Sequence, residues 1–168
     1  YANNLMPYDS VDNFDVQIPK GYTQLQAKQT PGVDRFEFGG IPHDHTIYAF
    51  MDFEIYPETA LAQKEDFATA VKHWEQRITD QFQPNMTDYV QTPVEIGEIN
   101  GMPAARIYAR GLSRYTDGSI DHLHVIAYRV RSKGVDAFIE ATDIEPYSND
   151  SLPLMEASCL SMKPLPGK

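Results

Sequence analysis

The sequence predicts an α+β protein in which an antiparallel β-sheet is flanked by helices, a three-layer α/β/α sandwich. Three strand-like segments follow one another between Met102 and Asp143 with only short turns between them, which indicates a β-meander. The middle segment is largely apolar on both sides, so it needs a cover on each face. Two amphipathic stretches, one centred on Trp74 and one near the end of the chain, are candidate helices for these covers.

The meander has a strand period and hairpin turn chemistry. In residues 105–110, small apolar residues alternate with two arginines and a tyrosine, which is the two-residue period of a pleated strand. The Asp117-Gly118 step supplies the positive φ that a tight hairpin needs. The segments Ile120 to Arg131 and Val135 to Thr142 complete the meander.

The N-terminal third predicts further strands. Residues 1–13 show no period and are interpreted as an irregular lead-in. Alternation over Phe14 to Pro19 predicts a strand, and shorter extended segments are expected at Tyr22 to Lys28 and Val33 to Phe38. Thr46 to Tyr56 is dense in β-prone apolar residues and predicts a buried strand.

From Thr59 the period changes to that of an amphipathic helix, which ends before Pro84. Large apolar residues recur at spacings of three and four in Phe67, Val71, Trp74, Ile78 and Phe82. Five such side chains stabilise the fold by about 1.5–3 kcal/mol each when fully buried. Trp74 is therefore predicted to fill the core rather than to stack on a ligand.

A short strand over Val94 to Ile99 leads through Asn100-Gly101 into the meander. A final helix is expected after it, capped by Ser151 or Asn149 and stopped by Pro164. Its apolar stripe consists of Leu152, Met155, Cys159 and Met162. Cys159, the single cysteine, excludes an intramolecular disulfide and is expected to be a small buried hydrophobe.

Length and charge limit the class of protein. A chain of 168 residues fits one domain, expected over residues 14–164. The net charge of −10 argues against a nucleic-acid partner, because phosphate binding needs a basic surface. No membrane span or signal peptide is recognisable. The chain begins with Tyr1 rather than Met, which is compatible with a mature or trimmed form from which a signal or lipid anchor was removed.

The meander departs from this acidic character. It holds six Lys/Arg against five Asp/Glu, a net charge of +1. The rest of the chain carries a net charge of −11, which gives the total of −10. Arg106, Arg110 and Arg114 share one strand face with Tyr108 and are the candidate binding residues. The alternative is that these arginines pair across strands with acids such as Asp136 or Glu140.

Four of the five histidines fall in two His-x-His pairs, each flanking an aspartate. Residues two apart on a strand point the same way, so His43/His45 and His122/His124 could each present two imidazoles to one ion. If the pairs meet, they would suit a Zn- or Cu-like site. Surface or hydrogen-bonded histidines are the alternative, and no other cofactor is expected.

Motifs for nucleophilic catalysis are absent. The sequence lacks Gly-x-Ser-x-Gly, a P-loop, a dinucleotide fingerprint and His-Glu-x-x-His. The adjacent carboxylates Glu65 and Asp66 fall on the polar side of the predicted long helix, where solvation explains them. An enzyme is therefore the least favoured class.

Several stretches resemble one known family. They are Phe14 to Tyr22, a strand that ends in Pro-x-Gly-aromatic; the helix around Glu65 to Ala68; Ile99 to Ala104, with its Gly-x-Pro-Ala hairpin; and a closing helix after two long strands. In this order they resemble the PsbP-like family, whose fold is shared by PsbP, the yeast Ran-binding protein Mog and exported bacterial proteins such as DcrB. The resemblance implies the α/β/α architecture and no catalytic motif.

Together these observations predict a non-catalytic binding or accessory domain that contacts a protein partner and works outside the cytoplasm, in the periplasm or at the cell surface. A metal-binding protein that uses the two histidine pairs is the alternative. The choice of function rests on analogy of fold and on residue patterns.

Overall fold

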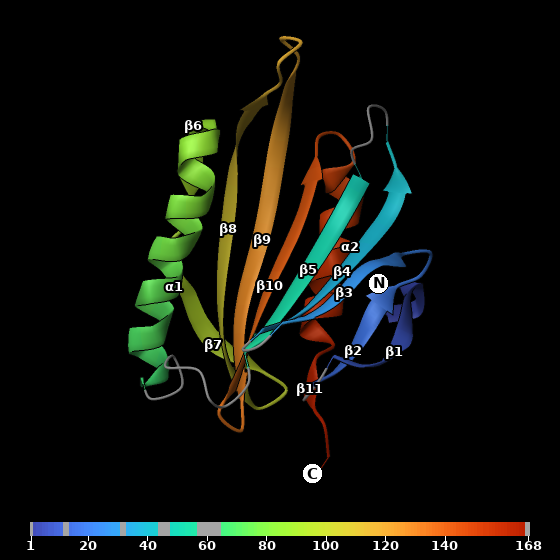
Figure 1. The fold of residues 1–168 in the computed structure, drawn as a ribbon, viewed down its shortest axis with the longest axis vertical. Coiled ribbons are helices and arrows are strands. Elements are labelled where there is room, and N and C mark those ends of the chain that lie inside the picture. Colours follow the sequence, from blue (N-terminus) through green and yellow to red (C-terminus); the bar gives the residue numbers. More distant parts are fainter. Residues whose placement is uncertain (1, 12–13, 31–32, 44–47, 57–64, 167–168) are drawn as a thin grey trace.

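The structure is a computed structural model that describes residues 2–11, 14–30, 33–43, 48–56 and 65–166. In this part of the chain, eight strands form one antiparallel sheet in the order β3-β4-β5-β10-β9-β8-β6, with β7 also paired to β8 (Figure 1). The strands are β3 (Thr23–Thr30), β4 (Val33–Pro42), β5 (Tyr48–Tyr56), β6 (Thr87–Gln91), β7 (Glu95–Ile99), β8 (Met102–Arg114), β9 (Ile120–Ser132) and β10 (Val135–Ile144).

The predicted meander is confirmed as β8-β9-β10, at the centre and one side of this sheet. The β8–β9 hairpin is longer than its neighbours and projects beyond them (Figure 1). Strand β6 was not predicted. Its register shifts between Thr87 and Val90, and Asp88 has a positive φ of 52°, so no two-residue period is visible in its sequence.

Helix α1 (Phe67–Phe82) covers one face of β8 and β9. The Asp66 carboxylate caps it by accepting a hydrogen bond from the backbone N–H of Thr69 at 2.9 Å. Its predicted start at Thr59 lies outside the described residues. The cluster beneath the helix consists of Val71, Trp74, Ile78, Ala105, Ile107, Ala127 and Phe138. Trp74 is buried in this cluster, as predicted.

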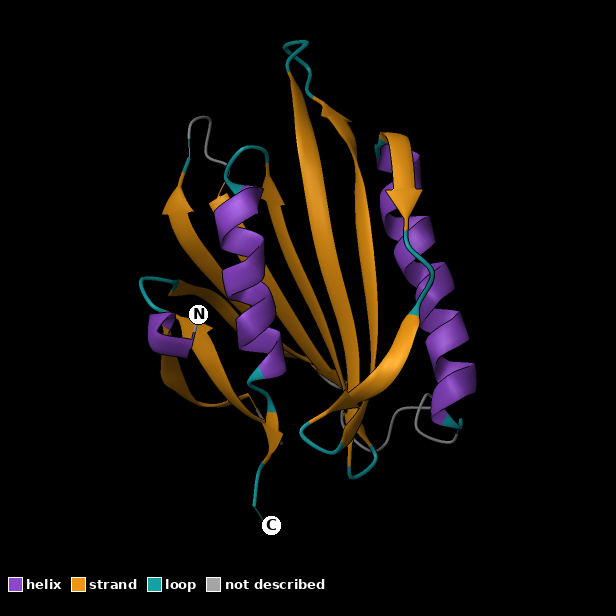
Figure 2. Ribbon diagram, turned by 180° about the vertical axis from the view of Figure 1, so that it is seen from behind, coloured by secondary structure: helices purple, strands orange, loops and turns teal. Residues whose placement is uncertain are grey.

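Helix α2 (Ser148–Leu160) lies on the opposite face. Alternate residues of β9 show this, because Ala127 belongs to the α1 cluster while Ile126 and Tyr128 belong to the cluster under α2. Figure 1 views the sheet from the α1 side and Figure 2 from the α2 side. The prediction of an α+β fold with an antiparallel sheet flanked by helices is confirmed.

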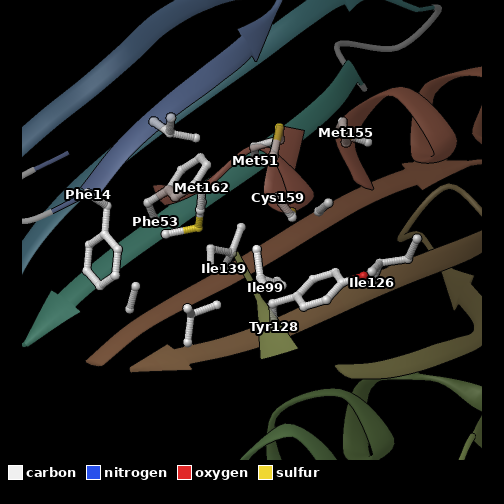
Figure 3. Packing of buried hydrophobic residues seen from close by; sticks show 14 of the residues in the cluster. Phe14, Met51, Phe53, Ile99, Ile126, Tyr128, Ile139, Met155, Cys159 and Met162 are labelled. Atoms are coloured by element: carbon white, nitrogen blue, oxygen red, sulfur yellow. The ribbon is translucent and has the colours of Figure 1, made fainter. Parts of the chain in front are cut away.

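The larger core lies between the sheet, α2 and a second, three-stranded sheet. In Figure 3, Met155 and Cys159 of α2 and the following Met162 lie among Met51, Phe53 and Ile139 of the large sheet and Phe14 of the small one. Cys159 is fully buried, and burial raises the pKa of its thiol. It is the small hydrophobe that the sequence predicted.

The small sheet corrects the prediction for residues 1–13. A 3-10 turn (Ala2–Asn4) leads into β1 (Leu5–Val11), which pairs with β2 (Phe14–Pro19); β11 (Lys163–Pro164) pairs with the other side of β2. The interpretation of an irregular lead-in is therefore wrong. Strand β1 is extended because it pairs with β2, a contact between segments that the period of its own sequence does not reveal.

The predicted ends of α2 are also wrong. The N-cap is Tyr147, without a side-chain hydrogen bond, and the Ser151 hydroxyl donates instead to Oδ2 of Asp143 at 2.5 Å. The helix ends at Leu160, and Pro164 lies in β11. The tertiary contact with Asp143 thus removes Ser151 from the local capping function that its residue type favours.

Candidate interaction site

The predicted arginine row lies on the α2 side of the sheet. Even-numbered residues of β8 face this side, and the β8–β9 register places Arg110 opposite His124, Leu112 opposite His122 and Arg114 opposite Ile120. The candidate binding residues and one of the two histidine pairs therefore share one surface. We call this surface the β8 face, and it consists of Arg106, Tyr108, Arg110, Leu112, Arg114, Ile120, His122 and His124.

Helix α2 leaves much of the β8 face open. It covers Ile126 and Tyr128, but Arg110 and Arg114 are exposed. Three adjoining hollows follow β8 along the helix, with volumes of about 190, 270 and 290 Å³. Arg106 lines the first two and His124 lines the last two, so the three hollows lie next to one another along β8, and we call them together the β8 groove.

This β8 groove has a floor, walls and an end. Its floor runs along β8 through Ala104, Arg106, Tyr108, Arg110 and Leu112. Helix α2 lines the middle hollow, β7 and Leu160 of α2 line the hollow at the Ala104 end, and β6 lines the hollow near the hairpin. The end near the β8–β9 hairpin is polar, because His122, His124 and Glu145 line it.

Arg106 differs from the other two arginines. Its Nε donates to Oε1 of Glu156 in α2 at 2.6 Å, and the Tyr128 hydroxyl donates to the same oxygen at 2.7 Å. Neither Arg110 nor Arg114 makes an ion pair or side-chain hydrogen bond within the described part of the chain. Arg110, at the hairpin end of the groove, and Arg114, outside its lining, are therefore exposed cations.

The alternative pairing of these arginines with Asp136 or Glu140 is wrong. Asp136 lies on the α1 side and binds Arg129 and Arg131, while Glu140 accepts a hydrogen bond from Gln81 of α1 at 2.8 Å. Both acids face away from the arginine row, since a strand directs alternate side chains to opposite faces.

A hydrogen-bonded chain links β8, β9 and the loop before α2. The Tyr108 hydroxyl lies 2.5 Å from Nδ1 of His124, and Nε2 of His124 lies 2.7 Å from Oε1 of Glu145. A neutral imidazole protonated on Nε2 satisfies both contacts. Burial raises the pKa of Tyr108, while the hydrogen bond with His124 lowers the pKa of Glu145. Tyr108 thus stays a neutral hydroxyl donor.

His122 also faces Glu145. Its Nδ1 lies 3.8 Å from Oε2 of that carboxylate, and its side chain is 59% exposed. The prediction that His122 and His124 point the same way is confirmed by this shared neighbour. Glu145 was missed in the sequence analysis because it joins the histidines only through the β9–β10 pairing.

Of the other histidine pair, the structure describes His43. His43 stacks on Tyr147 with ring centroids 3.6 Å apart, and its Nε2 lies 3.2 Å from Oδ2 of the buried Asp143. His45 lies outside the described residues. Among the residues that the structure describes, no group of three or more His, Cys, Asp or Glu side chains has the arrangement of a metal site.

His43, Asp143 and Ser151 bear on the question of catalysis. Both the imidazole and the Ser151 hydroxyl bind the Asp143 carboxylate. A nucleophilic serine needs the imidazole next to its own hydroxyl. Here the Asp143 carboxylate lies between the imidazole and the hydroxyl, so His43 does not activate Ser151. The three residues anchor the loop before α2.

No protein-family model and no curated protein matches the sequence, but solved structures match the fold. Cyanobacterial PsbP (CyanoP) from Synechocystis sp. PCC 6803 is 16% identical with a TM-score of 0.65, over 96% of this chain and 92% of that chain. The Ran-binding protein Mog1p of Saccharomyces cerevisiae is 9% identical with a TM-score of 0.60, over 96% of both chains. LpqN of Mycobacterium tuberculosis, involved in cell envelope biogenesis, is 10% identical with a TM-score of 0.61, over 95% of this chain and 89% of that chain.

The chain is thus an antiparallel-sheet protein with a helix on each face and, beside α2, an open surface on which Arg110 and Arg114 are exposed. Its fold is the PsbP-like fold, as the sequence motifs predicted. In the described part of the chain, neither α-helix combines the length and apolar character that a membrane crossing requires.

Proposed function

We propose that this protein is a non-catalytic binding or accessory domain that contacts a protein partner through the β8 face. The observation that carries the proposal is the open groove beside α2, with Arg110 and Arg114 exposed and without ion pairs among the described residues. Exposed cations on an otherwise acidic protein are not needed for packing, and they favour encounter with a negatively charged surface.

The similar structures support a binding function and give weaker support for the compartment. Mog1p is a Ran-binding protein, and LpqN is involved in cell envelope biogenesis. We propose that this chain likewise binds a protein and that it works outside the cytoplasm, in the periplasm or at the cell surface. Similarity of fold gives no partner, because one fold serves many functions.

The contacts around the groove favour binding over catalysis. Tyr108 has a raised pKa, Cys159 is buried, and the Ser151 hydroxyl donates to Asp143, with no histidine of the described residues hydrogen bonded to it. None of these groups combines exposure with the activation that a nucleophile needs. The polar chain from Tyr108 to Glu145 is better suited to hold the rim of the groove in place.

The test is a comparative capture experiment from extract of the source cells. The immobilised wild-type chain is compared with Arg110→Glu and Arg114→Glu, and with Lys72→Glu on the exposed side of α1 as a matched charge reversal. We expect a protein that the wild type and Lys72→Glu retain and that both arginine variants lose. Retention of the same protein by all four chains contradicts the proposed face.

A second candidate function is metal binding by His122 and His124. The observation in its favour is that both imidazoles face the Glu145 carboxylate. These three groups do not have the arrangement of a metal site in the structure, so a Zn²⁺ or Cu²⁺ ion would bind them only after the side chains rearrange. Both nitrogens of His124 already bind Tyr108 and Glu145, so the ion would have to displace at least one of these contacts.

Thermal melting with Zn²⁺ in excess tests this candidate. A bound metal raises the melting temperature of the wild type, and the rise is absent in His122→Asn, whose exposed side chain contributes little to folding. Equal melting temperatures with and without Zn²⁺ rule the candidate out.

A further inference from the structure

We propose that a pocket beside α2 binds a small, uncharged ring compound that carries an N–H donor and a carbonyl acceptor, such as a cyclic amide. The pocket has no lining residue in common with the β8 groove, so the inference does not depend on the proposed function. It is derived from the walls of the pocket, its two unpaired polar atoms and its charges.

Three parts of the chain form the pocket, which has a volume of about 290 Å³. Tyr22 contributes from the end of the turn between β2 and β3, Ala49 from β5, and Tyr147 and Leu154 from α2 and the loop before it. Two aromatic rings and two aliphatic side chains make these walls largely apolar. An apolar cavity of about 150 Å³ holds one benzene ring, so the pocket suits a compound of one or two rings.

Gly40 of β4 fixes the position of the Tyr22 ring. A Cβ atom added at Gly40 would lie 2.9 Å from Cε1 and 3.0 Å from Cζ of Tyr22, so any other residue there would push the hydroxyl end of the ring away. The same Cβ atom would lie 3.2 Å from Cβ of Ala49, which places the hydroxyl end of Tyr22 near the Ala49 wall. Burial and the charge of Asp143 raise the pKa of Tyr22, so its hydroxyl stays protonated and can donate.

His43 supplies an acceptor. Its ring stacks on Tyr147, and its Nε2 lies 3.2 Å from Oδ2 of Asp143. The Asp143 carboxylate also accepts hydrogen bonds from the Ser151 hydroxyl and the backbone N–H of Ile144, so it acts as an acceptor towards His43 as well. In the neutral imidazole the proton is therefore on Nε2, and Nδ1 keeps its lone pair.

The Tyr22 hydroxyl and Nδ1 of His43 have no hydrogen-bond partner among the residues that the structure describes. In the same residues, no buried side-chain nitrogen or oxygen lacks such a partner, so both atoms must be accessible. Both side chains line the pocket, which thus presents one donor and one acceptor to a bound molecule. A cyclic amide is complementary, because its N–H can donate to Nδ1 of His43 and its carbonyl can accept from Tyr22.

The charges in the pocket do not select an ion. Lys20 and Asp150 contribute one cation and one anion to its lining. Nζ of Lys20 donates to the backbone carbonyl of Asn3 at 2.6 Å, and Asp150 is exposed in the first turn of α2. Asp143, behind His43, already accepts from three donors. With one charge of each sign in its lining, the pocket favours an uncharged compound over an anion or a cation.

The experiment is an NMR titration of the ¹⁵N-labelled chain at about pH 8, so that imidazoles are neutral. The probes are two cyclic amides, uracil with one ring and 2-quinolone with two. The matched controls are their N-methylated derivatives, which keep the carbonyl groups and lose every N–H. We expect at least one cyclic amide to shift the amide signals of Tyr22, Ala49 and Leu154 at millimolar concentration. Its N-methylated derivative should bind about three- to tenfold more weakly, as expected for the loss of one hydrogen bond.

Variants locate the bound molecule. Tyr22→Phe removes only the hydroxyl and should weaken binding about three- to tenfold, whereas Tyr89→Phe removes a hydroxyl in β6, outside the pocket, and should leave binding unchanged. Leu154→Trp fills the pocket and should weaken binding at least about tenfold, whereas Leu160→Trp, at an exposed position of the same helix, should not. Melting temperatures of all variants are measured first, so that unfolding is not mistaken for loss of binding.

Several results would overturn the inference. If neither cyclic amide shifts these signals, the pocket does not bind this class of compound, and unchanged binding in Leu154→Trp would place the bound molecule elsewhere. Equal affinities for a cyclic amide and its N-methylated derivative would show binding through the apolar walls alone. Tighter binding of benzoate or benzylammonium would assign the pocket to an anion or a cation. None of these results bears on the proposed function, because capture through Arg110 and Arg114 tests residues outside this pocket.

Discussion

The two sides of β8 and β9 use arginine in opposite ways. On the side under α1, Arg129 and Arg131 both bind Asp136, and Arg129 also donates to the backbone carbonyl of Ala70 in that helix. On the α2 side, Arg110 and Arg114 extend from the same pair of strands into solvent. The same residue type is paired where a helix covers the sheet and exposed where no helix covers it.

Carboxylates show the same contrast. Glu140, on the α1 side, has a raised pKa because burial disfavours its charge. Glu145, beside the β8 groove, has a lowered pKa because it accepts a hydrogen bond from His124. The covered side penalises charge unless it is paired, whereas the open side accepts it.

The largest expected effect is at the centre of the covered side. Asp136→Asn leaves the buried Arg129 without its charged partner, and breaking a buried pair lowers the free energy of unfolding by about 3–5 kcal/mol. Urea denaturation measures this loss. Asp80→Asn, at an exposed position of α1, is the control and is expected to change stability by less than about 0.5 kcal/mol. Similar losses of unfolding free energy in the two variants would contradict the contrast between the covered and the open side of the sheet.

Two isoleucines allow a direct comparison of the α1 side and the β8 face. Ile78 of α1 is 1% exposed and Ile120 of β9 is 42% exposed. Ile78→Ala is expected to destabilise the protein by about 2–5 kcal/mol through lost contacts and a cavity. Ile120→Ala is expected to lower stability by less than about 1 kcal/mol, because much of its surface stays in water. Equal denaturation midpoints would show that the β8 face is covered in solution.

The raised pKa of Glu140 predicts a pH-dependent effect. The folded state binds the proton of the Glu140 carboxyl more tightly than the unfolded state does. The resulting stabilisation is complete below about pH 4.5 and is lost as pH rises through the pKa of Glu140 in the folded state. Glu140→Gln keeps an acceptor for Gln81 and is expected to be more stable than the wild type at pH 7, by up to about 1 kcal/mol. Denaturation at pH 4 and pH 7 measures this gain, which should shrink at pH 4.

Glu145 should behave in the opposite sense. Its pKa is lowered, so its stabilising contribution is present above about pH 4.5 and is lost as pH falls through the folded pKa. Glu145→Gln is therefore expected to be less stable than the wild type at pH 7 and closer to it in acid. The same pH series measures both variants, and an effect of equal sign in the two would contradict the contrast.

The smallest expected effect is at the exposed arginines. Arg110→Glu and Arg114→Glu are each expected to change the free energy of unfolding by no more than about 0.5 kcal/mol, because neither makes an ion pair in the described part of the chain. Chemical denaturation checks this. A loss above about 2 kcal/mol in either variant would assign these arginines to folding rather than to binding.

Strong local periods in the sequence were sufficient to predict much of the fold. The apolar residues of α1 recur at helical spacing, and β8, β9 and β10 follow one another through short turns, so each pairing joins neighbours in the chain. Strands β1 and β6 were missed because pairing with another segment, rather than their own period, makes them extended.

The candidate site was predicted in part. The sequence placed Arg106, Arg110 and Arg114 on one strand face, and it placed His122 beside His124. It did not identify Glu145 or Glu156, since each reaches the site through a contact between distant segments. The acid partners expected for the arginines, Asp136 and Glu140, lie on the opposite face for the same reason.

By itself the sequence determined which residues share a face, because the two-residue period of a strand and the 3.6-residue period of a helix are properties of the local backbone. Only the tertiary structure decided which of those faces is covered. Helix α2 packs over Ile126 and Tyr128 and ends before it reaches Arg110, and this position depends on its contacts with the small sheet and with β5 and β10. Burial is a property of the whole assembly of elements, so the groove appears only when they are packed together.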